Sequence, residues 1–155
     1  MAVFLAQHGA SLPKDRDPEK GLSQAGRSDT QRMAEVGAAY KIPVAGILHS
    51  GKTRARQTAE IFEASLNPKV PTRAIEGIGP MDDVAAFAKT IKPGENLLVV
   101  GHLPFLGKLV SLLTCGQADA LVYQFQNSGI LCLDTQGGGA PGAWYIKWGL
   151  NPRVD

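Results

Sequence analysis

Residues 3–9, Val3-Phe4-Leu5-Ala6-Gln7-His8-Gly9, form an apolar run that stops abruptly at a polar residue, a histidine and a glycine. Four consecutive apolar residues are typical of a strand that is covered on both faces, as in a parallel sheet. Gly9 lets the backbone turn sharply and come close to a ligand. The stretch therefore predicts a buried strand that presents His8 at its end, and His8 is the first candidate for chemistry.

The same pattern recurs once, because residues 96–102 are an apolar run that ends in Gly101 and His102. Strand-like and helix-like segments alternate along the rest of the chain. The predicted strands are 3–7, 44–48, 70–76, 96–101, 128–134 and 143–150, and the predicted helices are 23–40, 52–66, 82–91 and 104–113. This βαβα order predicts an α/β fold, a three-layer α/β/α sandwich with a mostly parallel central sheet and a C-terminal edge hairpin.

Length and composition fit one soluble domain spanning residues 1–155, with 44% hydrophobic and 19% charged residues. A net charge of +2 is too small to argue for a nucleic-acid partner. The N-terminal apolar run is too short for a membrane span and has no basic region before it, so we expect no membrane association and a cytoplasmic protein. Cys115 and Cys132 lack the spacing of a metal site or a disulfide framework, and we expect two buried thiols.

Ligands of open parallel sheets bind at the carboxyl ends of the strands. The residues that leave those ends here are His8, Ser50 with Arg54, and His102. Ser50 is a plausible N-cap, so two helix N-termini and the Arg54 guanidinium would make a site for a phosphoryl group. A histidine beside that group can attack it and form a phosphohistidine, while His102 donates a hydrogen bond to the phosphoryl oxygens.

The sequence contains no P-loop, no Cys-x5-Arg loop and no clustered carboxylates that would hold Mg²⁺. We therefore predict a site that uses no metal and no other cofactor.

Several short motifs together resemble the histidine phosphatase superfamily, which has the phosphoglycerate mutase-like fold. Within it, the chain is most similar to the small SixA-type phosphohistidine phosphatases. The resemblance rests on Gln7-His8-Gly9, on residues 50–60, on Gly101-His102-Leu103-Pro104, and on the stretches 22–27 and 79–84. It covers residues 1–113 well and the C-terminal hairpin loosely.

The resemblance implies a role for each matching position. His8 would be the nucleophile that becomes phosphorylated, and Arg54 and His102 would complete the catalytic pocket. The predicted phosphate-binding set is Gln7, Gly9, Ser50, Arg54 and His102. SixA-type enzymes remove phosphate from histidine phosphotransfer domains and lack a large lid, so the expected partner is such a phosphorylated protein or a small phosphoester. Phosphate or sulfate is expected to bind at the site.

The chain departs from the family pattern at two places. The usual motif is Arg-His-Gly, whereas this sequence has Gln7, and the missing positive charge has candidate substitutes in Lys14, Arg16 and Lys52. No carboxylate is unambiguously the general acid; the candidates are Glu76, Asp82 and Asp83, of which alignment with the family's Pro-x-x-Asp-Val segment favours Asp83. The alternatives to an active phosphohistidine phosphatase are a weak or inactive member that binds phosphorylated partners and a small-molecule phosphatase or mutase.

Overall fold

The computed structural model describes residues 2–154. These residues form a six-stranded sheet in the order β3-β2-β4-β1-β5-β6. The strands are β1 (Ala2–Gln7), β2 (Gly46–His49), β3 (Arg73–Ala74), β4 (Leu97–Gly101), β5 (Ile130–Thr135) and β6 (Trp144–Leu150). The helices are α1 (Gln24–Ala39), α2 (Thr53–Leu66), α3 (Val84–Ala88) and α4 (Phe105–Cys115).

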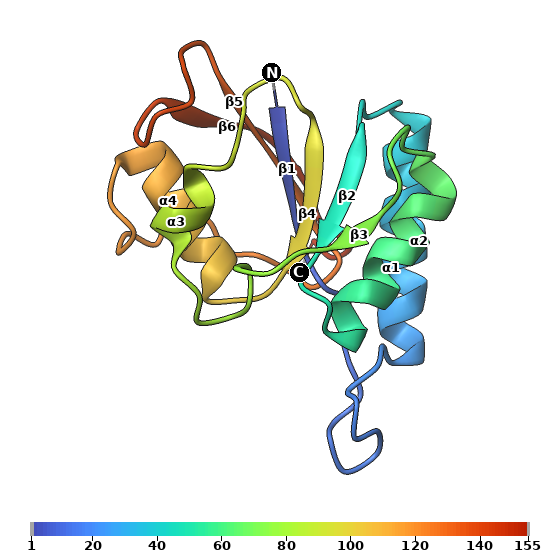
Figure 1. Cartoon of the computed structure of the whole chain (residues 1–155). Coiled ribbons are helices and arrows are strands. Elements are labelled where there is room, and N and C mark those ends of the chain that lie inside the picture. Colours follow the sequence, from blue (N-terminus) through green and yellow to red (C-terminus); the bar gives the residue numbers. More distant parts are fainter. Residues whose placement is uncertain (1, 155) are drawn as a thin grey trace.

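The predicted architecture is confirmed. Strands β3, β2, β4 and β1 pair in parallel, whereas β5 is antiparallel to β1 and forms an edge hairpin with β6. Helices α1 and α2 lie on one side of the sheet and α3 and α4 on the other (Figure 1). The sheet is thus the middle layer of a three-layer sandwich.

Alternation along the central strands builds a separate apolar core on each face of the sheet. Phe4 and Leu98 belong to the cluster that packs under α1 and α2, while Leu5 and Val99 belong to the cluster under α3 and α4. Successive strand residues point to opposite faces, so a strand buried on both sides must be apolar at every position. This requirement explains the unbroken apolar runs of β1 and β4.

Two predicted elements are shorter in the structure. The strand expected at 70–76 is reduced to the two residues of β3, and the helix expected at 82–91 has only the five residues of α3. The strand β3 is an edge strand whose two residues are both exposed, and Pro71 just before it lacks an N–H to donate to a ladder. The other predicted elements agree with the structure to within about two residues.

Two local predictions are wrong. Ser50 does not cap α2, because the N-cap position is Lys52. Cys115, expected to be buried, is exposed at the last residue of α4, and only Cys132 is buried.

None of the described helices is long and apolar enough to cross a membrane.

Candidate active site

The register of β1 on β4 places two histidines side by side. Gln7 is paired with Gly101 in this parallel ladder, so the next residue in each strand is a histidine. The His8 N–H donates to the Gly101 carbonyl at 3.1 Å, and the rings of His8 and His102 have their centroids 5.1 Å apart. The carboxyl edge of the sheet therefore carries a histidine pair, as the sequence predicts.

Strand β2 and helix α2 bring two further predicted residues to this pair. The Arg54 Nε donates to His8 Nε2 at 3.3 Å, and the Ser50 hydroxyl forms a hydrogen bond with His102 Nε2 at 2.6 Å. Ser50 therefore contacts His102 instead of serving as the N-cap of α2. His8, Ser50, Arg54 and His102 come from three segments of the chain and form one cluster.

The turn after His8 is held from both sides by side chains. The Gly9 N–H donates to Thr58 Oγ1 at 2.9 Å, and Asn127 Nδ2 donates to the His8 carbonyl at 2.9 Å. A Cβ at Gly9 would lie 2.7 Å from Thr30 Oγ1, which is shorter than ordinary contacts. Gly9 is thus required by close packing. The sequence carries no signal for Asn127, which arrives from the irregular segment before β5.

Burial and positive charge keep both histidines neutral. Burial lowers the pKa of His8, as do the charges of Arg54 and Lys20, while the hydrogen bond to Gly9 opposes them. Burial lowers the pKa of His102 to about 3, with further contributions from His8, Arg54 and Lys52. An uncharged imidazole is the form that can act as a nucleophile or accept a proton.

The basic residues that act on the histidines are only partly those expected to replace the charge missing at position 7. Of the three candidates for the charge missing at position 7, Lys52 acts on His102, whereas no such effect of the exposed Lys14 or Arg16 is found. Lys20, at the end of the loop before α1, acts on His8 instead. Lys20 could not be chosen from the sequence, because its position depends on how the loop folds back.

Gln7 is the last residue of β1 and has an unsatisfied polar group. Its Oε1 is buried and has no hydrogen-bond partner among the described residues. Gln7 lines a cavity of about 400 Å³ together with Leu103, Asn127 and Arg153. Position 7 thus carries no charge, and the cavity that Gln7 lines is not lined by His8, Arg54 or His102.

Asp83, expected as the general acid, is the N-cap of α3. Its Oδ1 accepts hydrogen bonds from the N–H groups of Ala85 and Ala86 at 2.9 and 3.3 Å. No partner of its Oδ2 is found within residues 2–154. The other two carboxylate candidates, Glu76 and Asp82, line a cavity of about 580 Å³ that also contains Ser50 and Lys52.

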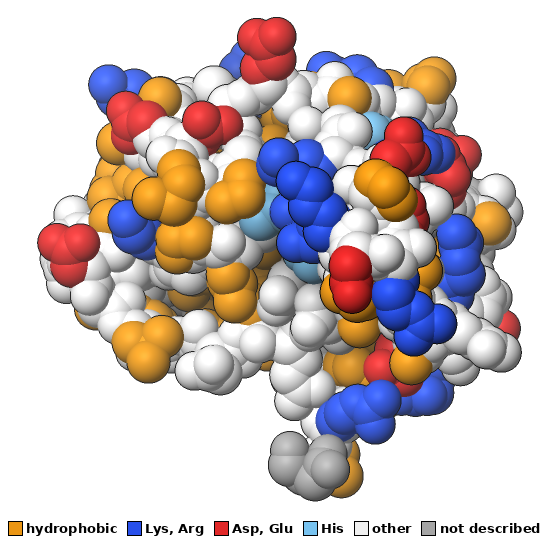
Figure 2. Space-filling view, turned by 90° about the horizontal axis from the view of Figure 1, so that it is seen from below, with side chains coloured by type: hydrophobic (Ala, Val, Ile, Leu, Met, Phe, Trp, Pro, Cys, Tyr) orange, Lys and Arg blue, Asp and Glu red, His pale blue; other side chains and the backbone are white. Residues whose placement is uncertain are grey.

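The face that carries the site has a basic centre with an apolar border. Lys and Arg side chains gather in the middle of this face beside histidine, and hydrophobic side chains lie on the side of α3 and α4 (Figure 2). The charges that act on the two histidines are those of Lys20, Lys52 and Arg54. This distribution suits an anionic group at the histidines.

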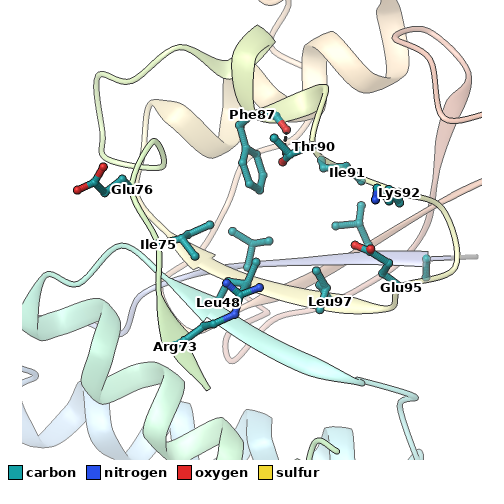
Figure 3. A pocket seen from close by; sticks show the side chains of 13 residues that line it. Leu48, Arg73, Ile75, Glu76, Phe87, Thr90, Ile91, Lys92, Glu95 and Leu97 are labelled. Carbon is teal, nitrogen blue, oxygen red and sulfur yellow. Dashed lines mark hydrogen bonds between the residues drawn. The ribbon is translucent and has the colours of Figure 1, made fainter. Parts of the chain in front are cut away.

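A different cavity, of about 370 Å³, lies between α3 and the sheet (Figure 3). Phe87, Ile75 and Leu97 point into it, and the Arg73 and Glu95 side chains lie at its borders (Figure 3). None of the histidines lines it, so it is separate from the anion site. Between residues 2 and 154, no group of three His, Cys, Asp or Glu side chains is arranged to hold a metal ion.

Comparison with known proteins identifies relatives over nearly the whole chain. The phosphohistidine phosphatase SixA of Escherichia coli is 28% identical over an alignment of 160 positions, which covers 98% of this chain and 94% of that protein. An uncharacterized protein of Picosynechococcus is 30% identical over 130 residues, which cover 76% of this chain and 75% of that protein. No protein-family model matches the sequence.

The solved structures agree with these relatives. The protein histidine phosphatase SixA in complex with tungstate superposes with a TM-score of 0.83 and 26% identity, covering 98% of this chain and 97% of that one. Tungstate resembles phosphate in charge and shape, so that protein has a site for a tetrahedral oxyanion. The shared fold, the histidine pair at the carboxyl edge of the sheet and the similarity along the chain lead to one conclusion: this protein belongs to the histidine phosphatase superfamily, as a homologue of SixA.

Proposed function

We propose that this protein is a phosphatase that takes a phosphoryl group from a protein phosphohistidine onto His8 and then transfers it to water. The observation that carries the proposal is the placement of a neutral His8 imidazole beside Arg54 and His102 at the end of β1. Nucleophile, cation and hydrogen-bond donor then surround one phosphoryl group.

The hydrogen bonds of His8 select the attacking atom. The Gly9 carbonyl only accepts, so the 2.7 Å bond to it places the proton of the neutral ring on Nδ1. The lone pair is then on Nε2, which faces the Arg54 Nε at 3.3 Å. His8 Nε2 is therefore the nitrogen that attacks phosphorus, and Arg54 is placed to bind the phosphoryl oxygens.

His102 acts as a neutral donor in this proposal. Its Nδ1 is buried without a partner among the described residues, while Nε2 is hydrogen-bonded to Ser50. Unpaired buried N–H groups are rarer than unpaired acceptors, which favours the tautomer with its proton on Nε2. An oxygen of a phosphoryl group bound at His8 would accept a hydrogen bond from the His102 Nε2–H, and the Ser50 hydroxyl would be a second donor.

The reaction takes place in two displacements. In the first, a bond forms between His8 Nε2 and phosphorus while the bond from phosphorus to the substrate imidazole breaks, and the substrate, which carries a proton on its other nitrogen, leaves as neutral imidazole. In the second, water attacks phosphorus, the bond to His8 breaks, His8 regains its neutral form with the proton on Nδ1, and inorganic phosphate leaves with both protons of the water. Charge on the phosphoryl oxygens is stabilised throughout by Arg54 and the nearby hydrogen-bond donors.

Asp83 remains the proposed source of the leaving-group proton. Its Oδ1 is engaged in the cap of α3, which leaves Oδ2 as the atom that can face a substrate. A substrate imidazole departs readily once it is protonated on its other nitrogen, whereas an alcohol or phenol needs the proton at the bond that breaks. Asp83 therefore matters more for phosphate esters than for phosphohistidine.

Lys20 and Lys52 take over the charge that the family's arginine supplies. Lys20 acts electrostatically on His8, and Lys52 acts electrostatically on His102. Exposed ammonium groups are screened by water more strongly than a buried guanidinium. The proposal thus predicts a slower enzyme than one with arginine at position 7, but an active one.

The test is a phosphoryl-trapping experiment with His8→Ala as the control. Protein is incubated with chemically prepared phosphohistidine in the presence of EDTA, and phosphate release and acid-labile phosphate on the protein are both measured. We expect release and a trapped phosphoryl group for the unmodified protein and neither for the variant. Equal release by both proteins would contradict the role of His8.

A second candidate function is binding of phosphorylated partners without turnover. It is favoured by Gln7, whose unpartnered Oε1 places no charge where the family has arginine. The same experiment separates the two, since a binder would retain a phosphohistidine protein on a column and release no phosphate from it.

A further inference from the structure

We propose that a groove between the start of α4 and residues 117–125 docks a helix of the protein that carries the phosphohistidine. The groove would receive an apolar side chain that lies about one helical turn from the phosphorylated histidine. This inference rests on the proposed function, since it assigns the partner of the same site.

The groove has an apolar lining that is open to solvent. It has a volume of about 330 Å³, and Leu103, Leu121, Tyr123 and Phe125 are among its lining residues. Leu103 is 38% exposed and Leu121 is 81% exposed. Adjacent exposed side chains of this size are a common mark of a protein interaction site.

Leu121 is held in the solvent by an ordered backbone. On one side, the Ala120 N–H donates to the Ser111 hydroxyl at 3.0 Å, and Ser111 is fully buried in α4. On the other side, Tyr123 packs edge-on against Phe125 and accepts a hydrogen bond from Asn151 at 3.0 Å. A backbone that is already ordered on both sides of Leu121 loses little conformational entropy on binding.

The groove begins beside the catalytic cluster. Leu103 directly follows His102, so the Cα atoms of the two residues are about 3.8 Å apart. On a helix, side chains three or four positions apart have Cβ atoms about 5–6 Å apart. A helix that presents phosphohistidine to His8 can therefore place a neighbouring apolar side chain on Leu103 and Leu121.

Charge orients the helix across this face. Lys20, Lys52 and Arg54 lie around the histidines, whereas the groove carries one charge of each sign, Lys108 and Asp119. The phosphoryl group is thus drawn to the basic centre, and the apolar neighbour to the groove. Helix-in-groove recognition uses apolar anchors at this spacing.

The test measures binding and turnover separately, with Leu121→Asp and the matched control Val70→Asp. Val70 is 49% exposed. Its N–H donates to the carbonyl of Ala45, which directly precedes β2. Val70 therefore lies near the β3-β2 edge of the sheet, away from the groove. Binding is measured in the His8→Ala background, which cannot form the phosphoenzyme, with a helical histidine phosphotransfer domain phosphorylated by phosphoramidate as the probe. Turnover of free phosphohistidine is measured with His8 intact.

We expect Leu121→Asp to weaken binding of the phosphorylated domain by roughly tenfold or more, as for a central apolar anchor. Turnover of free phosphohistidine should stay within about twofold, because Leu121 does not touch the histidine cluster. Val70→Asp should change neither quantity.

Unchanged binding by Leu121→Asp overturns the docking proposal while phosphate release continues to support the phosphatase. Loss of release from every chain, with the binding difference intact, refutes the phosphatase and leaves the docking surface standing. A change in the oligomeric state on Leu121→Asp would assign the groove to a second copy of this chain and also overturn the proposal.

Discussion

Acidification should destabilise the folded protein through His102. This side chain is 1% exposed, and burial together with the charges of His8, Arg54 and Lys52 lowers its pKa from 6.5 to about 3. Between these two values the unfolded chain binds a proton at His102 and the folded chain does not. The free energy of unfolding is therefore fully retained above pH 6.5 and falls as the pH decreases toward 3.

The size of the effect follows from the two pKa values of His102. Lowering the pH from 7.5 to 5 costs about 2 kcal/mol from this one group. Urea denaturation at the two pH values measures it, with His102→Gln as the control because glutamine does not titrate. The unmodified protein should lose about 2 kcal/mol more than the variant over this interval.

Equal losses by the two proteins would contradict this prediction, because they would mean that His102 is protonated with similar ease in the folded and unfolded states. Sulfate offers an independent check. A bound dianion between the histidines favours their charged forms, so saturating sulfate should reduce the pH dependence in the unmodified protein. An unchanged pH dependence would argue against an anion site at this pair.

Three further substitutions test the proposed roles of individual residues. Gln7→Arg should raise kcat/KM for phosphohistidine by about 5- to 30-fold, the equivalent of 1–2 kcal/mol of charge-assisted bonding; no change would mean that the lysines already compensate. Lys20→Met should lower kcat/KM several-fold at low salt and less at high salt, whereas the exposed Lys14→Met should not, and equal effects would remove Lys20 from the site. Asp83→Asn keeps a good helix cap, so the melting temperature should be unchanged while hydrolysis of phenyl phosphate falls by about 10²-fold or more; full activity would limit Asp83 to capping.

The fold and the centre of the site follow from local features of the sequence. The apolar runs before His8 and His102 are long enough to require burial on both faces, which fixes them as central parallel strands. The carboxyl ends of neighbouring parallel strands lie at one edge, so the two histidines had to be close together. Arg54 joined them because α2 starts from the same edge.

The features that the sequence did not predict depend on contacts between distant segments. Serine is a residue type that favours N-caps, but the Ser50 hydroxyl forms a hydrogen bond with His102, which is 52 positions away. Asn127 reaches the His8 carbonyl from 119 positions away, and Lys20 approaches through the course of a loop. No spacing rule within one element encodes such partners, because they exist only after the elements have packed.

The position of β1 in the sheet separates chemistry from recognition. β1 has β4 on one side and β5 on the other. His8 therefore follows a strand whose backbone hydrogen bonds are satisfied along both edges. Leu121 and Lys20, in contrast, lie on irregular segments outside the sheet. Sequence changes in those segments can alter the surface around His8 without moving its imidazole, so proteins of this fold can vary the groups around the histidine pair while the pair itself stays in place.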